Sequence, residues 1–283
     1  MDGIVNFLKP TGLTSSQAIG RVKRAFGRRD VGHLGTLDPF AAGVLPVAVG
    51  KATKLFDLYL QKTKTYRALM KFGFESDTWD SSGTVTRRGV VPTDAQVAES
   101  AQSIVGTYAQ IPPSYSAKSI NGVRAYDLAR KGIKPDLQPK TITIFRCDAA
   151  KSPVEGVYAF DIECSAGTYI RSVVKDMADK MNAYGILVGL IRTASGPWRI
   201  DNAVTETELF VNPEACLKPL SVLLQDLPRV DVSVTEYKKI ANGVPIKTTQ
   251  FVAAPFTVFC NDELFGLGRI KDGQMTLDVY LHE

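Results

Sequence analysis

Residues 31–43 have the sequence VGHLGTLDPFAAG, a glycine-rich loop that places a single carboxylate, Asp38, directly before a proline. A residue that precedes proline is restricted to extended backbone conformations, so Asp38 is held in one direction. Gly32 and Gly35 carry no side chain, which allows the loop to lie close to another surface, including a ligand. Two interpretations stay open. Asp38 either points at a substrate or caps a helix that begins at Pro39, since proline favours the first helical position.

The segments before this loop predict a strand followed by a helix. Residues 3–10, GIVNFLKP, are expected to form a strand that ends at a proline. Residues 13–27, LTSSQAIGRVKRAFG, place apolar side chains on one face of a helix. Thr14 or Ser15 is its expected N-cap, and Gly27 its expected stop.

The segments after the loop predict an α+β protein. Residues 41–55, AAGVLPVAVGKATKL, predict a helix, a turn and a strand in close packing. Residues 64–74 alternate in a strand-like way, with one apolar face. Further helices are expected at 94–106, 125–131 and 167–181, and further strands at 140–149, 157–166 and 187–198.

Two regions suggest how the chain is divided. Residues 110–136 have two prolines near their start, Pro112 and Pro113, and hold a short helix, so a region from about 92 to 140 is expected to form an inserted hairpin-and-helix arm. The tail contains short β-type runs separated by Asn, Asp and Gly turns, as a small β-barrel-like module does. We expect one domain at 1–224 and the β module at 225–283.

Bulk properties exclude several classes of protein. Hydrophobic residues make up 45% and charged residues 22% of the 283 residues, which is ordinary for a globular protein. No apolar run approaches the roughly 20 residues that a membrane span needs, and the N-terminus lacks a signal-peptide layout. We expect a cytoplasmic location and no membrane partner. The four cysteines are scattered and form no CxxC pair, which argues against a zinc site and against a disulfide framework.

The formal net charge of +5 is unevenly spread along the chain. Two basic clusters stand out, one within residues 1–40 and one within residues 117–140. Their members are Lys9, Arg21, Lys23, Arg24, Arg28 and Arg29 in the first, and Lys118, Arg124, Arg130, Lys131, Lys134 and Lys140 in the second. A polyanionic partner and a solvated helix face explain such clusters equally well on charge alone.

Three other side chains carry chemistry that Asp38 would need. Arg171 begins a predicted helix, where it either supports a buried carboxylate or pairs with a surface acid. Tyr66 lies mid-strand, where it either stacks on a planar base or packs in the core. His33 is either a proton shuttle, a ligand or a stacking group, or a satisfied loop residue.

Common cofactor motifs are absent from the sequence. VGKATK fails as a P-loop, because Leu45 and Ala52 replace the required glycine and hydroxyl residue. The chain has no GxGxxG motif, and ESDTWDSSG lacks the alternating acids and later glutamate of a calcium loop. With only two histidines, His33 and His282, a histidine-based triad is not supported. We therefore expect no metal and no nucleotide cofactor.

Several segments in the right order over about residues 3–200 resemble the TruB family of tRNA pseudouridine synthases. They are LKPTGLTSS at 8–16, GHLGTLDPFAAGVLPVAVGKATK at 32–54, KTYRALMKFG at 64–73, PPSYSAKSINGVRAYDLARKG at 112–132, GTYIRSVVKDM at 167–177 and LIRTASG at 190–196. The resemblance implies a pseudouridine-synthase fold, with a mixed, mainly antiparallel central sheet flanked by helices. It also implies that the tail is a small PUA-like β module.

The resemblance implies a role for each candidate residue. Asp38 matches the nucleophile, Tyr66 the tyrosine that packs on the target base and handles the proton at C5, and Arg171 the arginine that pairs with the aspartate. His33 matches the histidine that inserts where the flipped nucleotides leave the RNA loop. The remaining matches are to substrate-binding positions. Lys9 and Pro10 match a supporting pair under the loop, and Tyr169, Leu190 and Arg192 match residues that line the pocket.

The implied activity is conversion of uridine to pseudouridine at position 55 in the T-loop of tRNA, by a monomer that needs no cofactor. Two alternatives remain at this stage. One is the catalytic subunit of a guide-RNA complex of the dyskerin type, and the other is a tRNA chaperone or binding module. The tail, residues 226–283, carries six basic and eight acidic side chains, which argues against a strong electrostatic grip of this module on RNA.

Overall fold

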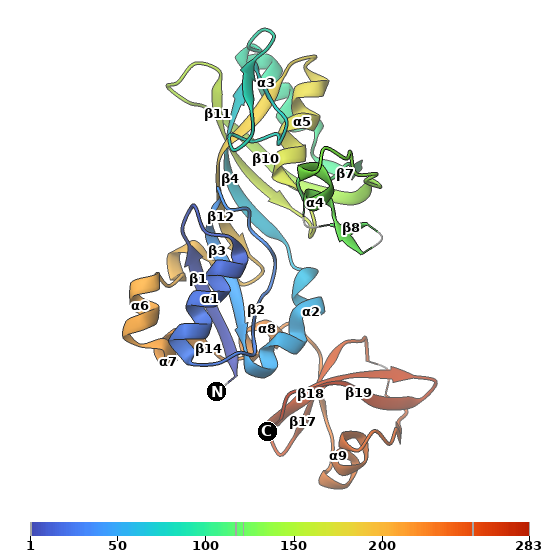
Figure 1. Ribbon diagram of the computed structural model, residues 1–283. Helices are drawn as coiled ribbons and strands as arrows, with labels where there is room; N and C mark the ends of the chain where they lie inside the picture. The colour runs from blue at the N-terminus through green and yellow to red at the C-terminus, as the bar shows by residue number, and fades with distance from the viewer. Residues whose placement is uncertain (1, 117, 121, 251, 283) are drawn as a thin grey trace.

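A computed structural model describes residues 2–116, 118–120, 122–250 and 252–282 (Figure 1). Two sheets organise the described chain. The larger sheet has ten strands among these residues, and eight of them follow the order β14-β1-β3-β12-β4-β11-β10-β7. Their bounds are Leu217–Lys218 (β14), Gly3–Lys9 (β1), Ala42–Val49 (β3), Gly185–Ser195 (β12), Lys64–Phe72 (β4), Val157–Cys164 (β11), Lys140–Lys151 (β10) and Gly106–Gln110 (β7).

The two remaining strands extend the larger sheet locally. They are β2 (Val31–His33), which pairs with β3, and β13 (Trp198–Arg199), which pairs with β12. The neighbours in this sheet run antiparallel except for β12 and β3, which are parallel. The expected α+β class with a mixed, mainly antiparallel sheet is therefore confirmed.

Buried and exposed side chains alternate along β4, so other elements cover only one face of this strand. Its even-numbered side chains from Lys64 to Phe72 are buried, and Arg67 and Leu69 between them are exposed. The helices α3 (Asp94–Ser103) and α5 (Ile170–Lys180) supply buried apolar side chains to the core that contains this face of β4. In Figure 1 both helices lie beside the upper part of the sheet.

The helix predicted at 13–27 is confirmed as α1 (Ser15–Phe26). Thr14 is its N-cap and forms a capping box with Gln17, while Gly27 ends it in the left-handed conformation at φ 62°. A glycine adopts that conformation without the steric cost of a Cβ atom. The local signals at both ends of this helix were sufficient to place it.

The prediction for residues 41–55 was wrong. A strand comes first, β3, and a 3-10 helix, η1 (Gly50–Leu55), follows it. Pro46 lies in the middle of β3, opposite Asn6 of β1. A proline inside a central strand is unusual because it cannot donate a hydrogen bond, and this explains the failure of the sequence pattern.

The other helices and short strands connect these elements at the surface or at the sheet ends. The hairpin expected in the arm is formed by β8 (Ser119–Ile120) and β9 (Val123–Arg124), and the short helix α4 (Ala125–Arg130) follows it. The remaining connecting elements are α2 (Phe56–Leu60), β5 (Phe74–Ser76), β6 (Val85–Arg87), η2 (Ile200–Asn202), α6 (Glu206–Val211), α7 (Pro213–Cys216) and α8 (Ser221–Leu224).

The tail forms the second sheet, with the strand order β15-β17-β18-β19-β16 among the described residues. The elements are β15 (Arg229–Asp231), α9 (Val234–Ala241), β16 (Ile246–Lys247), β17 (Phe256–Cys260), β18 (Glu263–Lys271) and β19 (Gln274–Tyr280). The expected β module is thus present, with one added helix. A shared apolar cluster, here called the joint cluster, contains buried side chains from both sheets and from their connections. It includes Ile4, Val44, Tyr59, Leu223, Leu267 and Leu281.

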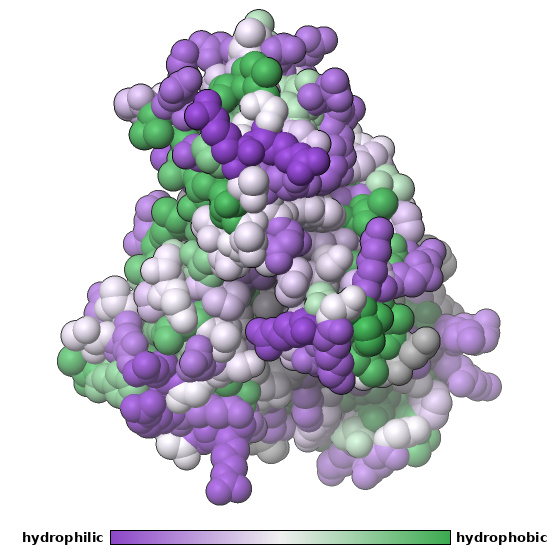
Figure 2. All heavy atoms as spheres, turned by 45° about the horizontal axis from the view of Figure 1, so that its top comes forward, coloured by the Kyte–Doolittle hydropathy of each residue, from purple (hydrophilic) through white to green (hydrophobic). Residues whose placement is uncertain are grey.

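None of the described helices combines the length and apolarity that a bilayer crossing requires. Hydrophilic side chains cover much of the face shown in Figure 2, and the apolar patches between them are separate from one another.

Candidate active site

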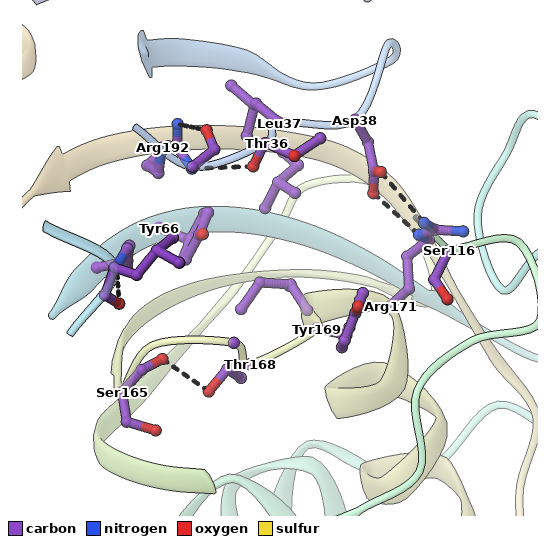
Figure 3. Close-up of a pocket in the computed structure, with 16 residues that line it drawn as sticks. Thr36, Leu37, Asp38, Tyr66, Ser116, Ser165, Thr168, Tyr169, Arg171 and Arg192 are labelled. Carbon is purple, nitrogen blue, oxygen red and sulfur yellow. Dashed lines mark hydrogen bonds and ion pairs between the residues drawn. The ribbon is translucent and has the colours of Figure 1, made fainter. Parts of the chain in front are cut away.

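A cavity of about 300 Å³ lies where the loop of residues 31–43 meets the strands β4 and β12 and the start of α5. This volume is at the lower end of the range for small-molecule sites, about 300–1,000 Å³. Six of the nine predicted site residues line it: Asp38, Tyr66, Tyr169, Arg171, Leu190 and Arg192. Figure 3 shows Asp38 and Arg171 paired on one side of the cavity, with Tyr66 and Arg192 on another.

Asp38 does not cap a helix. The backbone turns at Pro39 and Phe40, and the N–H of Ala41 donates to the carbonyl of Asp38 at 3.1 Å. The carboxylate instead accepts two hydrogen bonds from Arg171, from Nε at 3.0 Å and from Nη2 at 3.2 Å. The capping interpretation is therefore wrong, and the carboxylate is available to a ligand in the cavity.

Arg171 is a buried residue in the first turn of α5, with 5% of its surface exposed. Besides the Asp38 carboxylate, its guanidinium contacts the carbonyls of Tyr115 (2.9 Å) and Thr78 (3.4 Å). Pairing with a surface acid is thus ruled out for this arginine. The planar guanidinium matches the two carboxylate oxygens in a fork, which fixes the orientation of Asp38 as well as supplying the opposite charge.

A second carboxylate, Asp80, lies behind the pair at 3.5 Å from Nε of Arg171. Its side chain is only 3% exposed, whereas that of Asp38 is 31% exposed. Asp80 also accepts hydrogen bonds from the hydroxyl of Thr78 (2.7 Å) and the N–H of Ser82 (2.9 Å). The two acids thus differ in access, since Asp38 faces the cavity and Asp80 is enclosed by protein.

The backbone before Asp38 is held by two side chains from other elements. The hydroxyl of Ser15, at the start of α1, both donates to the carbonyl of Leu37 and accepts from its N–H, each at 2.9 Å. Arg192 of β12, 1% exposed, donates to the carbonyls of Val44 (2.7 Å), Thr36 (3.2 Å) and Gly35 (3.2 Å). Arg192 therefore lines the cavity and also fastens the loop to the sheet.

Gly43 allows β3 to approach the backbone of Arg192 in β12 closely. Its φ is 111°, and a Cβ atom at this position would lie 2.3 Å from the carbonyl oxygen of Arg192. Any side chain would therefore push β3 away from β12.

Lys9 lies under the loop. It is fully buried, and its Nζ donates to the carbonyls of Leu13 (2.6 Å), Pro10 (2.8 Å) and Pro39 (3.4 Å). Burial lowers the pKa of its ammonium group to about 8, although the nearby Asp38 charge opposes that shift. Pro10 itself is exposed and lies outside the cavity lining.

The two tyrosines of the cavity keep their protons. Tyr66 lies on the buried face of β4, directly opposite Arg192 in the register of β4 and β12. Burial raises the pKa of Tyr66, and burial likewise raises the pKa of Tyr169, which directly precedes α5. Both rings therefore present a neutral hydroxyl. Leu190, 7% exposed, adds an apolar wall.

His33 ends β2 and does not line the cavity. Burial lowers the pKa of its imidazole, and the positive charge of Arg192 adds to the effect, so the ring is neutral near pH 7. Its Nδ1 atom is buried and has no hydrogen-bond partner within the described part of the chain.

Three residues of this site were not identified as site residues from the sequence: Ser15, Lys64 and Asp80. Lys64 lines the cavity and is buried, and its Nζ donates to the carbonyls of Lys62 (2.5 Å) and Leu60 (3.2 Å). Burial lowers its pKa to about 8. Ser15 and Asp80 act through contacts with Leu37 and Arg171 that only the tertiary fold creates, so no local pattern could have identified them. The hydrogen bonds of Lys64 are local, and its place in the cavity wall follows from the fold. Among the described residues, no three acidic, Cys or His side chains gather where they could bind a metal ion.

Comparison with known proteins assigns this chain to a family. The model of the TruB family pseudouridylate synthase (N terminal domain) matches residues 23–170, more than half of the chain. The chain belongs to the TruB family. A tRNA pseudouridine synthase B from Alkaliphilus oremlandii is 36% identical and covers 96% of this chain and 94% of its own length. A tRNA pseudouridine synthase B from Clostridium kluyveri is also 36% identical, with 98% of each chain covered.

Solved structures agree with the fold of this TruB-family chain. The crystal structure of a Cbf5-Nop10-Gar1 complex contains a chain that matches with a TM-score of 0.72 at 24% sequence identity. The match covers 99% of this chain and 84% of the other. At this level of identity the similarity concerns the fold alone. It supports the two-sheet architecture, and any argument about activity must come from the residues of the site.

Proposed function

We propose that this TruB-family chain isomerises uridine to pseudouridine at position 55 in the T-loop of tRNA, with Asp38 as the nucleophile. The observation that carries the proposal is the fork of Arg171 on Asp38, at 3.0 and 3.2 Å, inside a cavity that Tyr66 also lines. A charged carboxylate needs a fixed counter-charge in a site that excludes water, and Arg171 supplies it.

The reaction rearranges one nucleotide without any cofactor. The target uridine leaves its stack at a cost of a few kcal/mol, and stacking on Tyr66 returns roughly 1–3 kcal/mol. Asp38 acts at the ribose, the bond from N1 to C1′ breaks, and a bond from C5 to C1′ forms. The hydrogen at C5 leaves as a proton while N1 gains one, so the product is an isomer of the substrate. In this mechanism Tyr66 handles the C5 proton, and Leu190, Tyr169 and Arg192 enclose the base.

The basic clusters are the proposed contacts to the T-arm. Arg124, Arg130, Lys131, Lys134 and Lys140 are exposed on or after the arm hairpin, and Lys23, Arg24 and Arg29 are exposed on or after α1. Cationic side chains at these positions can contact phosphates and so recognise a folded RNA by its shape. His33, with its neutral ring near the loop, is proposed to insert where the flipped nucleotides leave the T-loop. Pro10 completes the support that Lys9 gives to the active-site loop.

We also propose how the chain is divided into domains and in what form it acts. We assign the synthase domain to 1–224, including the arm at about 92–140, and a PUA-like module to 225–283. The chain is proposed to act as a cytoplasmic monomer. The 36% identity to tRNA pseudouridine synthase B over nearly the full chain favours this stand-alone form. The solved structures at 24% identity or less share the fold and do not argue for the guide-RNA alternative.

Release of tritium from tRNA transcript labelled at C5 of uridine, with the purified chain as the only protein, tests the proposal. We expect release from full-length tRNA and from an isolated T-arm, and loss of release when uridine 55 is replaced by cytidine. Asp38→Asn should bind the transcript with unchanged affinity and release no tritium, because only the ionised oxygen is removed. Normal release by this variant would refute the nucleophile. Activity only in the presence of a guide RNA would favour the alternative, and binding without release by the unaltered chain would favour a chaperone.

A further inference from the structure

The turn that connects β5 and β6 contains an unusual backbone conformation at Trp79, whose φ is 59°. The other described non-glycine residues with positive φ are Asn182, Asn261, Asp262 and Asp272. Asparagine and aspartate tolerate the left-handed region, but a bulky residue such as tryptophan rarely adopts it. An outlier of this kind persists only where the surrounding structure enforces it.

Neighbouring elements fix Trp79 on both sides. Its N–H donates to the carbonyl of Ser76 at 3.2 Å, and its carbonyl accepts from the N–H of Leu187 at 3.0 Å. Leu187 belongs to β12, so the turn is anchored to the central sheet beside the candidate active site. The conformation of residue 79 is therefore held by hydrogen bonds of its own backbone, and these do not involve the indole.

The residues on either side of Trp79 both contact Arg171. The carbonyl of Thr78 accepts from Nη1 of Arg171 at 3.4 Å, and Oδ2 of Asp80 lies 3.5 Å from Nε. In an extended strand a backbone carbonyl points along the hydrogen-bonding direction, whereas a side chain stands roughly perpendicular to the sheet, so the carbonyl of Thr78 and the carboxylate of Asp80 would point in different directions. A left-handed residue between them turns the chain sharply, which lets the carbonyl before it and the carboxylate after it face one guanidinium.

We propose that the left-handed backbone at Trp79 is a positioning device that orients Arg171, and through it Asp38. This inference rests on the proposed function for its effect on catalysis. Trp79 is not among the residues that line the cavity, and its contribution is the direction that it gives to Thr78 and Asp80.

The rest of the turn is built tightly around the same two groups. The hydroxyl of Thr78 donates to Asp80 at 2.7 Å, and the N–H of Ser82 donates to Asp80 at 2.9 Å. Gly83 closes the turn. A Cβ atom on Gly83 would lie 2.1 Å from Oδ1 of Asp77 and 2.5 Å from Oγ1 of Thr78. An alanine at position 83 must therefore displace the side chains of Asp77 and Thr78, and the hydroxyl of Thr78 is the group that donates to Asp80.

A substitution series at position 79 separates the backbone from the indole. Trp79→Gly and Trp79→Asn keep a residue that accepts positive φ, whereas Trp79→Val introduces a β-branched residue that resists it. We expect near-normal kcat for the Gly and Asn variants. For Trp79→Val we expect kcat to fall on the order of ten- to a hundredfold with KM for tRNA unchanged, because the catalytic groups shift while the RNA surface stays intact. Gly83→Ala should give the same loss.

Asp272→Val is the matched control, because Asp272 has a φ of 52° in the turn between β18 and β19 of the second sheet. Valine at position 272 would resist the positive φ in the same way as valine at position 79, but in the second sheet and away from Arg171. The thermal midpoint of this variant should fall as that of Trp79→Val does, while its kcat stays at the level of the unaltered protein.

A measurement without substrate keeps this inference separate from the proposed function. Exchange of the Arg171 Nε hydrogen, followed by nuclear magnetic resonance, should be slow in the unaltered protein and in Trp79→Gly, and clearly faster in Trp79→Val. An inactive unaltered protein that shows this exchange pattern would contradict the proposed function alone. Equal exchange of the Arg171 Nε hydrogen in all variants would overturn the inference. An equal loss of kcat in Trp79→Gly and Trp79→Val would also overturn it, because that result would assign the effect to the indole side chain.

Discussion

At the scale of single residues, Arg171 donates four hydrogen bonds, two to Asp38 and one each to the carbonyls of Thr78 and Tyr115. These acceptors come from three separate segments of the chain. One side chain therefore joins the loop that carries Asp38, the β5–β6 turn and a segment of the arm region.

Arg171→Lys should abolish most turnover. An ammonium group is a point charge on a flexible stem and cannot reproduce the fork or reach all of these oxygens. We expect kcat to fall by about a hundredfold or more. Arg67→Lys is the matched control, because Arg67 forms a similar fork with Asp161 at 2.9 and 2.8 Å on the exposed face of the sheet. Steady-state tritium release from tRNA compares the two, and equal kcat values would remove Arg171 from the mechanism.

The buried ammonium group of Lys9 is expected to make the free energy of unfolding depend on pH. Burial lowers its pKa to about 8, whereas a lysine in the unfolded chain keeps a pKa near its ordinary value of 10.5. Between these two values the unfolded chain binds more protons than the native one, so the free energy of unfolding rises with pH. The rise from one such group is at most about 1.4 kcal/mol per pH unit.

Lys9→Met removes the titrating group and keeps a side chain of similar length. Denaturant unfolding between about pH 8 and pH 9.5 should show a smaller rise in the free energy of unfolding for this variant than for the unaltered protein. Some rise should remain, because burial also lowers the pKa of Lys64 to about 8. Identical slopes would show that Lys9 does not titrate in this range.

At the scale of elements, the start of α1 combines two functions in neighbouring residues. Thr14 caps the helix, and Ser15 holds the backbone of Leu37 beside Asp38. The sequence identified the first role, because capping depends on residues three positions apart. It could not identify the second, because Leu37 lies 22 residues away from Ser15.

Alanine substitutions at these two positions should have different consequences. Thr14→Ala is expected to lower the free energy of unfolding by about 1 kcal/mol, the usual cost of a lost N-cap, without a change in kcat. Ser15→Ala should lower kcat, because the loop loses both hydrogen bonds that fix Leu37. Thermal unfolding and tritium release, measured on both variants, distinguish the roles. A normal kcat for Ser15→Ala would show that the loop holds Asp38 without this hydroxyl.

At the scale of the whole molecule, the joint cluster ties the two sheets together. Leu267 and Leu281 of the tail are buried with Ile4, Val44 and Tyr59 of the larger sheet and its connections. Lys51 and Lys54 of η1 add hydrogen bonds to the carbonyls of His282 and Tyr280. This interface contains both apolar and polar contacts, so we expect the two sheets to unfold as one unit.

Cysteine labelling in increasing denaturant tests this cooperativity. The four cysteines are buried, and burial raises the pKa of Cys147 and Cys164 to about 12, which protects the native thiols. Cys260 of the tail should become reactive at the same denaturant concentration as Cys147 and Cys164 of the larger sheet. Leu281→Ala, which opens a cavity in the joint cluster, should make Cys260 react first. Earlier reaction of Cys260 in the unaltered protein would show that the tail opens alone.

The sequence predicted those parts of the molecule that depend on neighbouring residues. The alternation of β4, the caps of α1 and the β character of the tail are of this kind. The resemblance to the TruB family added Asp38, Arg171 and Tyr66 as members of one site. The order of strand and 3-10 helix after Asp38 was predicted wrongly, since Pro46 is accommodated only by its neighbours in the sheet. The burial of Asp80 likewise arises from tertiary contacts.

The place of β12 in the sheet has a consequence for the order in which the protein matures. β12 lies between β3 and β4, although it is synthesised long after both. A nascent chain that ends at residue 180 already contains Asp38, Tyr66 and Arg171. It lacks Arg192, which fastens the loop before Asp38, and it lacks the strand that joins the two halves of the sheet. We therefore expect the candidate active site to form late in translation, after residues 185–195 have left the ribosome and closed the sheet.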